Sequence, residues 1–143
     1  MKISTKGRYA LRLMTDVAIH QADGLVPLKD VAARQGISVK YLEQIANTLS
    51  KAELLRSGRG AQGGYCLARD PALYTVGAIL RITEGNLAPV ACLETSENHC
   101  ERCDACATLD FWTGLYATVN AYVDRFTLAD LVRAEQEKTG TQT

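Results

Sequence analysis

The chain has 143 residues with 47% hydrophobic and 22% charged side chains, a composition typical of a soluble globular protein. Its net charge is zero, but residues 1–69 hold eleven Lys and Arg against five Asp and Glu, whereas residues 70–143 hold five against eleven. A basic half joined to an acidic half indicates that only the first half meets a polyanion.

No apolar run approaches the roughly 20 residues of a membrane-spanning helix, and the first six residues lack the apolar stretch of a signal peptide. We therefore expect a cytoplasmic protein with no membrane partner, in which thiols stay reduced. The five cysteines are an odd number, which fits a disulfide framework poorly.

The first fifty residues predict three helices. Apolar residues recur every three or four positions over 5–21, which is helical spacing. A second helix is expected over 27–36, with Pro27 in its first turn, and a third begins after the N-cap Ser38. One face of this third helix collects Leu42, Ile45 and Leu49.

A β-hairpin and a fourth helix are expected next. The strand-like runs 53–57 and 65–68 flank the loop 58–64, which is rich in glycine, as hairpin loops are. A helix over 76–83 follows.

The last third of the chain predicts a polar loop and two helices. The loop covers 87–106 and holds four of the five cysteines. A long helix is expected over 108–126, where apolar residues keep three–four spacing, and a short amphipathic helix over 128–136. The polar tail is expected to fray.

Two short helices joined by the turn 35–38 form a helix-turn-helix pattern, and the hairpin adds a wing. We therefore predict a mostly α fold in two regions. Residues 1–72 form a winged helix-turn-helix domain that binds double-stranded DNA, and residues 73–143 form a cysteine-loop and dimerisation region. The alternative is an ordinary three-helix unit with a surface hairpin, since a fold alone does not determine a function.

The third helix would enter the major groove with its N-terminal residues over the base edges. Gln44 can bind adenine through two hydrogen bonds, Glu43 can accept from cytosine, and Lys40 can reach a phosphate or a guanine. Tyr41 is either an aromatic at the edge of the core or a DNA backbone contact. The candidate DNA-binding residues are Lys6, Arg8, Lys40, Tyr41, Glu43, Gln44, Arg59 and Gly60.

No enzyme is expected. The chain has two histidines, His20 and His99, and no local pattern of a Ser/His/Asp triad. The glycine-rich loop 58–64 is not followed by Gly-Lys-Ser/Thr, so a nucleotide-binding loop is not indicated.

The four clustered cysteines, Cys92, Cys100, Cys103 and Cys106, have the spacing Cys-x7-Cys-x2-Cys-x2-Cys. Thiolates at such spacing suit an iron–sulfur cluster or another soft metal. Structural zinc, free surface thiols and a disulfide switch remain alternatives. Cys66 stands apart and is expected in the core.

Several motifs identify a family resemblance that covers residues 1–133. They are ISTKGRYA at 3–10, YLEQI at 41–45, RGAQGGY at 59–65 and TLADL at 127–131. Together with the cysteine loop, they closely resemble the IscR/NsrR/RirA family of bacterial winged-helix transcription regulators.

The resemblance implies a homodimer, with the helix 108–126 as its dimerisation helix, acting on a palindromic operator. It also implies an iron–sulfur cluster held by Cys92, Cys100 and Cys106. IscR-like sequences carry a histidine just after the third cysteine, which is absent here, and the region of the acidic ligand of NsrR-like members holds Arg8. Cys103 is therefore the candidate fourth ligand.

His99 or an exogenous group would be the next fourth ligand to consider. The cysteine spacing is closer to the RirA branch and favours a 4Fe–4S over a 2Fe–2S cluster. We accordingly predict a dimeric transcription regulator, expected to be a repressor, whose DNA affinity depends on a cluster that senses iron, redox state or nitric oxide. A zinc-stapled or disulfide-switched protein is the alternative.

Overall fold

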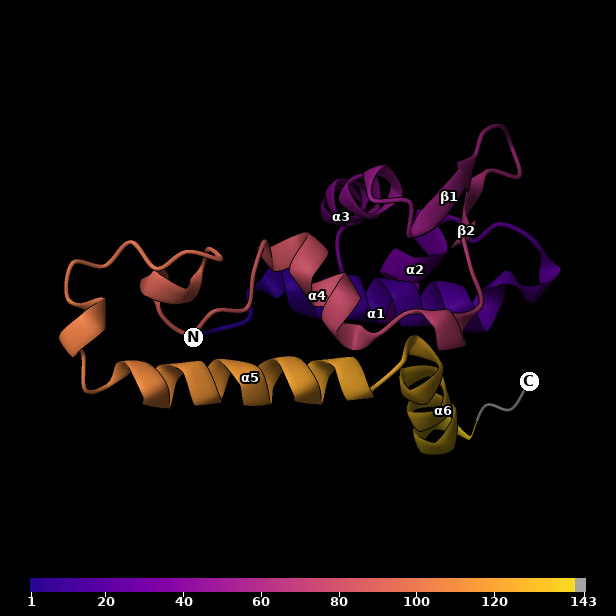
Figure 1. Ribbon diagram of the computed structural model, residues 1–143. Helices are drawn as coiled ribbons and strands as arrows, with labels where there is room; N and C mark the ends of the chain where they lie inside the picture. Colours follow the sequence, from indigo (N-terminus) through magenta and orange to yellow (C-terminus); the bar gives the residue numbers. More distant parts are fainter. Residues whose placement is uncertain (141–143) are drawn as a thin grey trace.

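The computed structural model describes residues 1–140 and shows a mostly α fold with one antiparallel hairpin, as predicted (Figure 1). The helices are α1 (Thr5–His20), α2 (Leu28–Gln35), α3 (Val39–Lys51), α4 (Val76–Glu84), α5 (Leu109–Arg125) and α6 (Leu128–Thr139). The strands are β1 (Leu55–Gly58) and β2 (Gly64–Leu67). The last three residues of the tail that was expected to fray lie outside the described part of the chain.

Most predicted boundaries agree with the structure to within a few residues. Pro27 is the N-cap of α2 rather than a residue of its first turn. The first strand begins two residues later than expected, because Glu53 has a φ of 62° and forms a turn that no strand can include. Within residues 1–140, no helix is long and apolar enough to cross a membrane.

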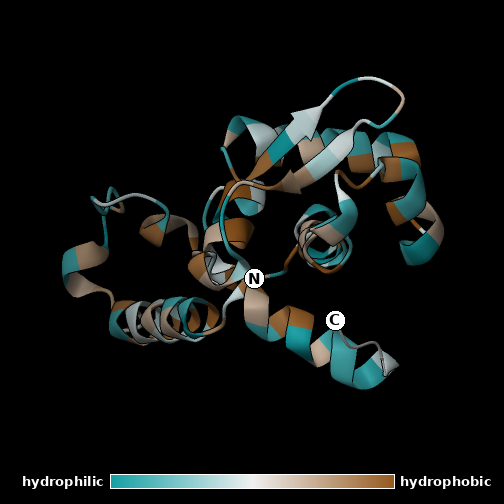
Figure 2. Ribbon diagram, turned by 90° about the vertical axis from the view of Figure 1, so that its right-hand side faces the viewer, coloured by the Kyte–Doolittle hydropathy of each residue, from teal (hydrophilic) through white to brown (hydrophobic). Residues whose placement is uncertain are grey.

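The core forms around α1, which lies at the centre of the molecule (Figure 1). Leu13 of α1 packs in one apolar cluster with Leu42 of α3, Ile79 of α4 and Leu128 of α6. Figure 2 shows the hydrophobic start of α6 turned toward this core and its hydrophilic second half beyond. The predicted regions 1–72 and 73–143 thus share one core. The boundary at residue 72 stays a prediction that rests on the difference in charge between the two regions.

A buried carboxylate joins the first two helices. Asp16 of α1 is only 1% exposed, and it accepts hydrogen bonds from the Arg34 guanidinium at 2.7–3.2 Å and from Gln35 Nε2 at 2.9 Å. The hydrogen bond to Asp16 raises the pKa of Arg34. Arg34 and Gln35 are the last two residues of α2, so their hydrogen bonds to Asp16 hold the end of α2 against α1, just before the α2–α3 turn.

Arg34→Ala is expected to lower the free energy of unfolding by about 3 kcal/mol, because it leaves the Asp16 charge buried without its arginine partner. Urea unfolding at neutral pH measures the change. Arg133→Ala is the matched control, since Arg133 pairs with Asp130 in an exposed salt bridge whose loss should cost no more than about 1 kcal/mol. Equal losses in the two variants would contradict the importance of the buried pair.

The long helix α5 is tied to α4 through polar contacts. The Arg81 guanidinium donates to both carboxylate oxygens of Asp124, at 2.7 and 2.8 Å, and to Asn120 Oδ1 at 2.9 Å. The hydrogen bond from Arg81 lowers the pKa of Asp124. Gly77 permits this approach, since a Cβ there would collide with the Asp124 carboxylate.

Candidate DNA-binding surface and cysteine loop

The third helix presents a polar face opposite its buried one. Ser38 caps α3, where its hydroxyl accepts from the backbone N–H of Tyr41 at 3.2 Å. Leu42, Ile45 and Leu49 are completely buried against α1. The exposed side carries the predicted base-reading residues and two neighbours: Lys40, Glu43, Gln44, Asn47 and Lys51.

Aromatic and polar contacts with α1 hold the start of α3 in place, and the sequence did not predict these contacts. Tyr41 is half-buried and meets Tyr9 of α1 edge to face, with ring centroids 5.8 Å apart. Arg12 lies over the Tyr9 ring, and its Nε donates to Gln35 Oε1 at 3.0 Å. This packing places Tyr41 at the edge of the core, while a contact of Tyr41 with the DNA backbone stays a prediction.

The wing is a short hairpin whose loop holds Arg59. The strands pair from Leu55 opposite Leu67 to Gly58 opposite Gly64, so the exposed Arg59 lies at the tip. Gly60 has a φ of 98°, a conformation that favours glycine. In Figure 1 this tip and α3 lie on the same side of α1.

The first helix carries the two remaining basic candidates, Lys6 and Arg8. Lys6 is half-buried and Arg8 is exposed, both in the first turn of α1. Arg8 borders a groove between α1 and α6, together with Leu131 and Lys138. The structure thus brings α3 and the wing tip to one side, while a DNA contact by Lys6 or Arg8 stays a prediction.

The cysteine loop is organised only by local turns. Cys92 lies in the 3-10 turn Ala91–Leu93 and Cys103 begins another at Cys103–Ala105. The Cys103 N–H donates to the Cys100 carbonyl at 3.1 Å, and the Leu109 N–H donates to the Cys106 carbonyl at 3.3 Å. The last of these bonds connects the loop directly to the first residue of α5.

All four thiols are free, and Cys100 is the most exposed of them. Within residues 1–140, no three Cys, His, Asp or Glu side chains converge closely enough to hold a metal ion. A hydrogen bond with the Thr108 hydroxyl, 3.4 Å away, lowers the pKa of Cys106. Desolvation and the adjacent Asp104 carboxylate raise the pKa of Cys103.

The chemistry of this donor set fits an iron–sulfur cluster. Four thiols within fifteen residues, none of them in a disulfide, form a dense group of soft ligands in the loop that precedes α5. Residues 88–108 contribute no side chain to either apolar cluster, so the loop can rearrange without disturbing the core. His99, the other candidate ligand of the loop, is exposed.

Comparison with known proteins identifies the family. Residues 3–134 match the Rrf2 family, described as iron-dependent transcriptional regulators. The HTH-type transcriptional regulator IscR of Yersinia enterocolitica is 39% identical over 132 residues, which cover 92% of this chain and 79% of the relative.

Solved structures with a similar fold agree with this family assignment. T. potens IscR superposes with a TM-score of 0.77 at 38% identity, covering 100% of this chain and 94% of that one. CymR, the global cysteine regulator of B. subtilis, also gives 0.77, at 36% identity over 94% of this chain and 98% of its own. The winged helix-turn-helix surface and these relatives lead to one conclusion: the chain is a DNA-binding transcription regulator of the Rrf2 family, and not an enzyme.

Proposed function

We propose that this regulator acts in the cytoplasm as a homodimeric repressor of genes with palindromic operators, and that an iron–sulfur cluster on each protomer sets its DNA affinity. The observation that carries the proposal is the group of four free thiols in the loop between α4 and α5. Cys92, Cys100 and Cys106 would hold the cluster, with Cys103 as the fourth ligand of a 4Fe–4S form. The cluster would supply sensitivity to iron, redox state or nitric oxide.

The long helix supports the dimer. α5 has seventeen residues and none of them is buried, because only one side packs against α4. Beside that packed side, Phe111 is 64% and Tyr122 57% exposed. An apolar cavity of about 360 Å³ borders the same stripe, between Tyr122, Leu80 and Ile3. A second copy of α5 would cover these side chains, as in a symmetric interface.

The position of the loop supports control of DNA binding. The Cys106 carbonyl accepts a hydrogen bond from the backbone N–H of Leu109, the first residue of α5. A cluster that fixed the position of Cys106 would therefore also change the position of the start of this helix. A dimer must match two half-sites, so a small rigid-body change between protomers can alter its DNA affinity sharply.

The direct test of the proposal is anaerobic purification followed by iron, sulfide and zinc analysis. DNA binding is then compared with and without the cluster. Iron and sulfide together with a change in DNA affinity would support the proposal. One zinc ion per chain without iron would support a zinc-stapled protein, and an affinity that follows oxidant in metal-free protein would support a disulfide switch.

Gln44→Ala is expected to weaken binding to the specific operator by about 1–3 kcal/mol, because an exposed glutamine in the first half of α3 can pair with an adenine edge. Binding to a non-specific duplex at the same salt concentration is the control and should change little. Equal losses on both duplexes would mean that Gln44 contacts only the DNA backbone.

A further inference from the structure

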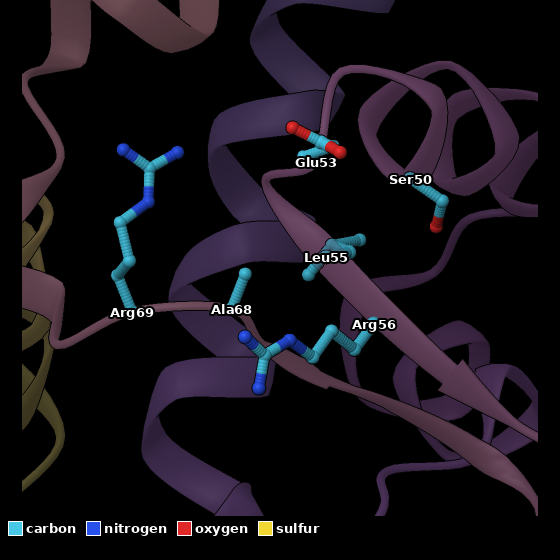
Figure 3. Close-up of a pocket in the computed structure, with 6 residues that line it drawn as sticks. All are labelled: Ser50, Glu53, Leu55, Arg56, Ala68 and Arg69. Atoms are coloured by element: carbon cyan, nitrogen blue, oxygen red, sulfur yellow. The ribbon is translucent and has the colours of Figure 1, made fainter.

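A second cavity lies at the base of the wing, away from the cysteine loop. Its volume is about 620 Å³, and it opens between the last turn of α3 and the ends of β1 and β2 that are remote from the wing tip (Figure 3). Six residues line it: Ser50, Glu53, Leu55, Arg56, Ala68 and Arg69. The proposed DNA contacts and the cluster use none of these six side chains.

The cavity holds two cations that lack anionic partners. Among residues 1–140, neither Arg56 nor Arg69 forms an ion pair or a side-chain hydrogen bond. Arg69 is nevertheless held in place, since its guanidinium lies 4.9 Å from the ring centroid of the buried Tyr74 and its backbone N–H donates to the Tyr74 hydroxyl at 2.9 Å. Figure 3 shows the Arg56 side chain running from β1 toward Ala68 and the side of Arg69.

One residue of the cavity wall, Ser50, has a hydroxyl without a hydrogen bond. Ser50 Oγ is buried, yet it has no partner among the described residues. A buried polar group of this kind costs about 1–3 kcal/mol unless a ligand or water satisfies it. Glu53, on the rim, has a φ of 62°, a left-handed backbone that is uncommon outside glycine and tends to occur at ligand sites.

We propose that this cavity binds a small organic or inorganic anion through a carboxylate or phosphate group. Arg56 and Arg69 would neutralise its charge, the planar guanidinium being suited to both groups. Ser50 would donate a hydrogen bond to one of its oxygens. Glu53 would accept from a hydroxyl or ammonium group on the same molecule, and so would favour ligands that carry a donor beside the anion.

A DNA phosphate fits this site less well than a free anion does. Arg69 lies beyond the end of β2 that is opposite the wing tip, and in Figure 3 Arg56 turns toward the same end. Because the ligand would touch the last turn of α3 and the first strand of the wing, it would also adjust their relative position. Any resulting change in DNA affinity rests on the proposed reading of DNA by α3 and the wing, whereas binding of the anion itself does not.

The test uses the full-length protein without DNA. Inorganic phosphate and citrate are titrated separately at constant ionic strength, and calorimetry and thermal unfolding report binding. We expect saturation at one anion per chain, and the tighter of the two probes identifies phosphate or carboxylate as the preferred group. Arg56→Gln and Arg69→Gln should each raise the dissociation constant at least tenfold, and Ser50→Ala severalfold without loss of thermal stability.

Arg59→Gln is the matched control, because it removes the same charge from the exposed tip of the same hairpin. It should leave anion binding unchanged. Equal weakening by Arg59→Gln would reveal diffuse attraction and overturn the proposal, as would the absence of saturation with both probes. Loss of DNA affinity in Arg56→Gln without any binding of free anion would assign the arginines to the DNA backbone instead, and would also overturn it.

Discussion

Cys92→Ala and Cys106→Ala are each expected to abolish the visible iron–sulfur absorption of anaerobically purified protein. Both thiols lie in the loop between α4 and α5, and a cluster deprived of one of its protein ligands is not retained. The measurement is the absorption spectrum together with iron and sulfide content per chain. An unchanged spectrum in either variant would rule that cysteine out as a ligand.

Cys66→Ala is the control for these variants. Cys66 lies in β2 opposite Arg56, outside the cysteine loop, so its removal should leave the spectrum and the iron content unchanged. If Cys66→Ala also removed the iron, loss of the cluster would reflect general destabilisation of the fold. Thermal unfolding of all the variants, measured in parallel, separates these two causes.

Cys103→Ala addresses the fourth ligand. We expect this variant to lose the spectrum of the wild type, because no histidine follows Cys106 and His99 is exposed in the loop. Retention of the full spectrum would exclude Cys103 and leave His99 or an exogenous ligand. His99→Ala, prepared alongside, distinguishes these two.

The sequence predicted the helices and the wing because the physical causes of these elements are local. Ser38 is three residues before the N–H that it caps, and Leu42, Ile45 and Leu49 share a face through helical periodicity alone. The start of β1 was misplaced because the left-handed conformation of Glu53 has no signal in the residue type.

The missed features all depend on residues that are distant in sequence. Asp16 meets Arg34 across eighteen positions, and Arg56 shares a cavity with Arg69 only because the hairpin folds back. One signal for the first was present, since Asp16 falls between Leu13 and Val17 in the apolar stripe of α1, where a charge needs a partner. Whether the four cysteines converge is likewise decided by the loop conformation, which spacing does not specify.

Thr118→Glu is expected to convert the dimer into a monomer and to weaken specific DNA binding by a factor on the order of 10²–10⁴. Thr118 is exposed and follows Phe111 and Leu115 at helical spacing, with Tyr122 one turn further along the apolar stripe of α5. A symmetric interface repeats each substitution, so two carboxylates would be brought into one apolar contact.

Light scattering on the wild type should give twice the chain mass of 15.6 kDa, and on Thr118→Glu a single chain mass. The control is Thr113→Glu, which places the same charge on the same helix at an exposed position off the stripe and should remain dimeric. If Thr113→Glu alone dissociated the dimer, the interface would lie on another face of α5. A wild type that is monomeric at micromolar concentration would contradict the dimer itself. Because both variants keep α3 and the wing intact, each should still bind DNA non-specifically, so any selective loss on the operator measures what the second protomer contributes.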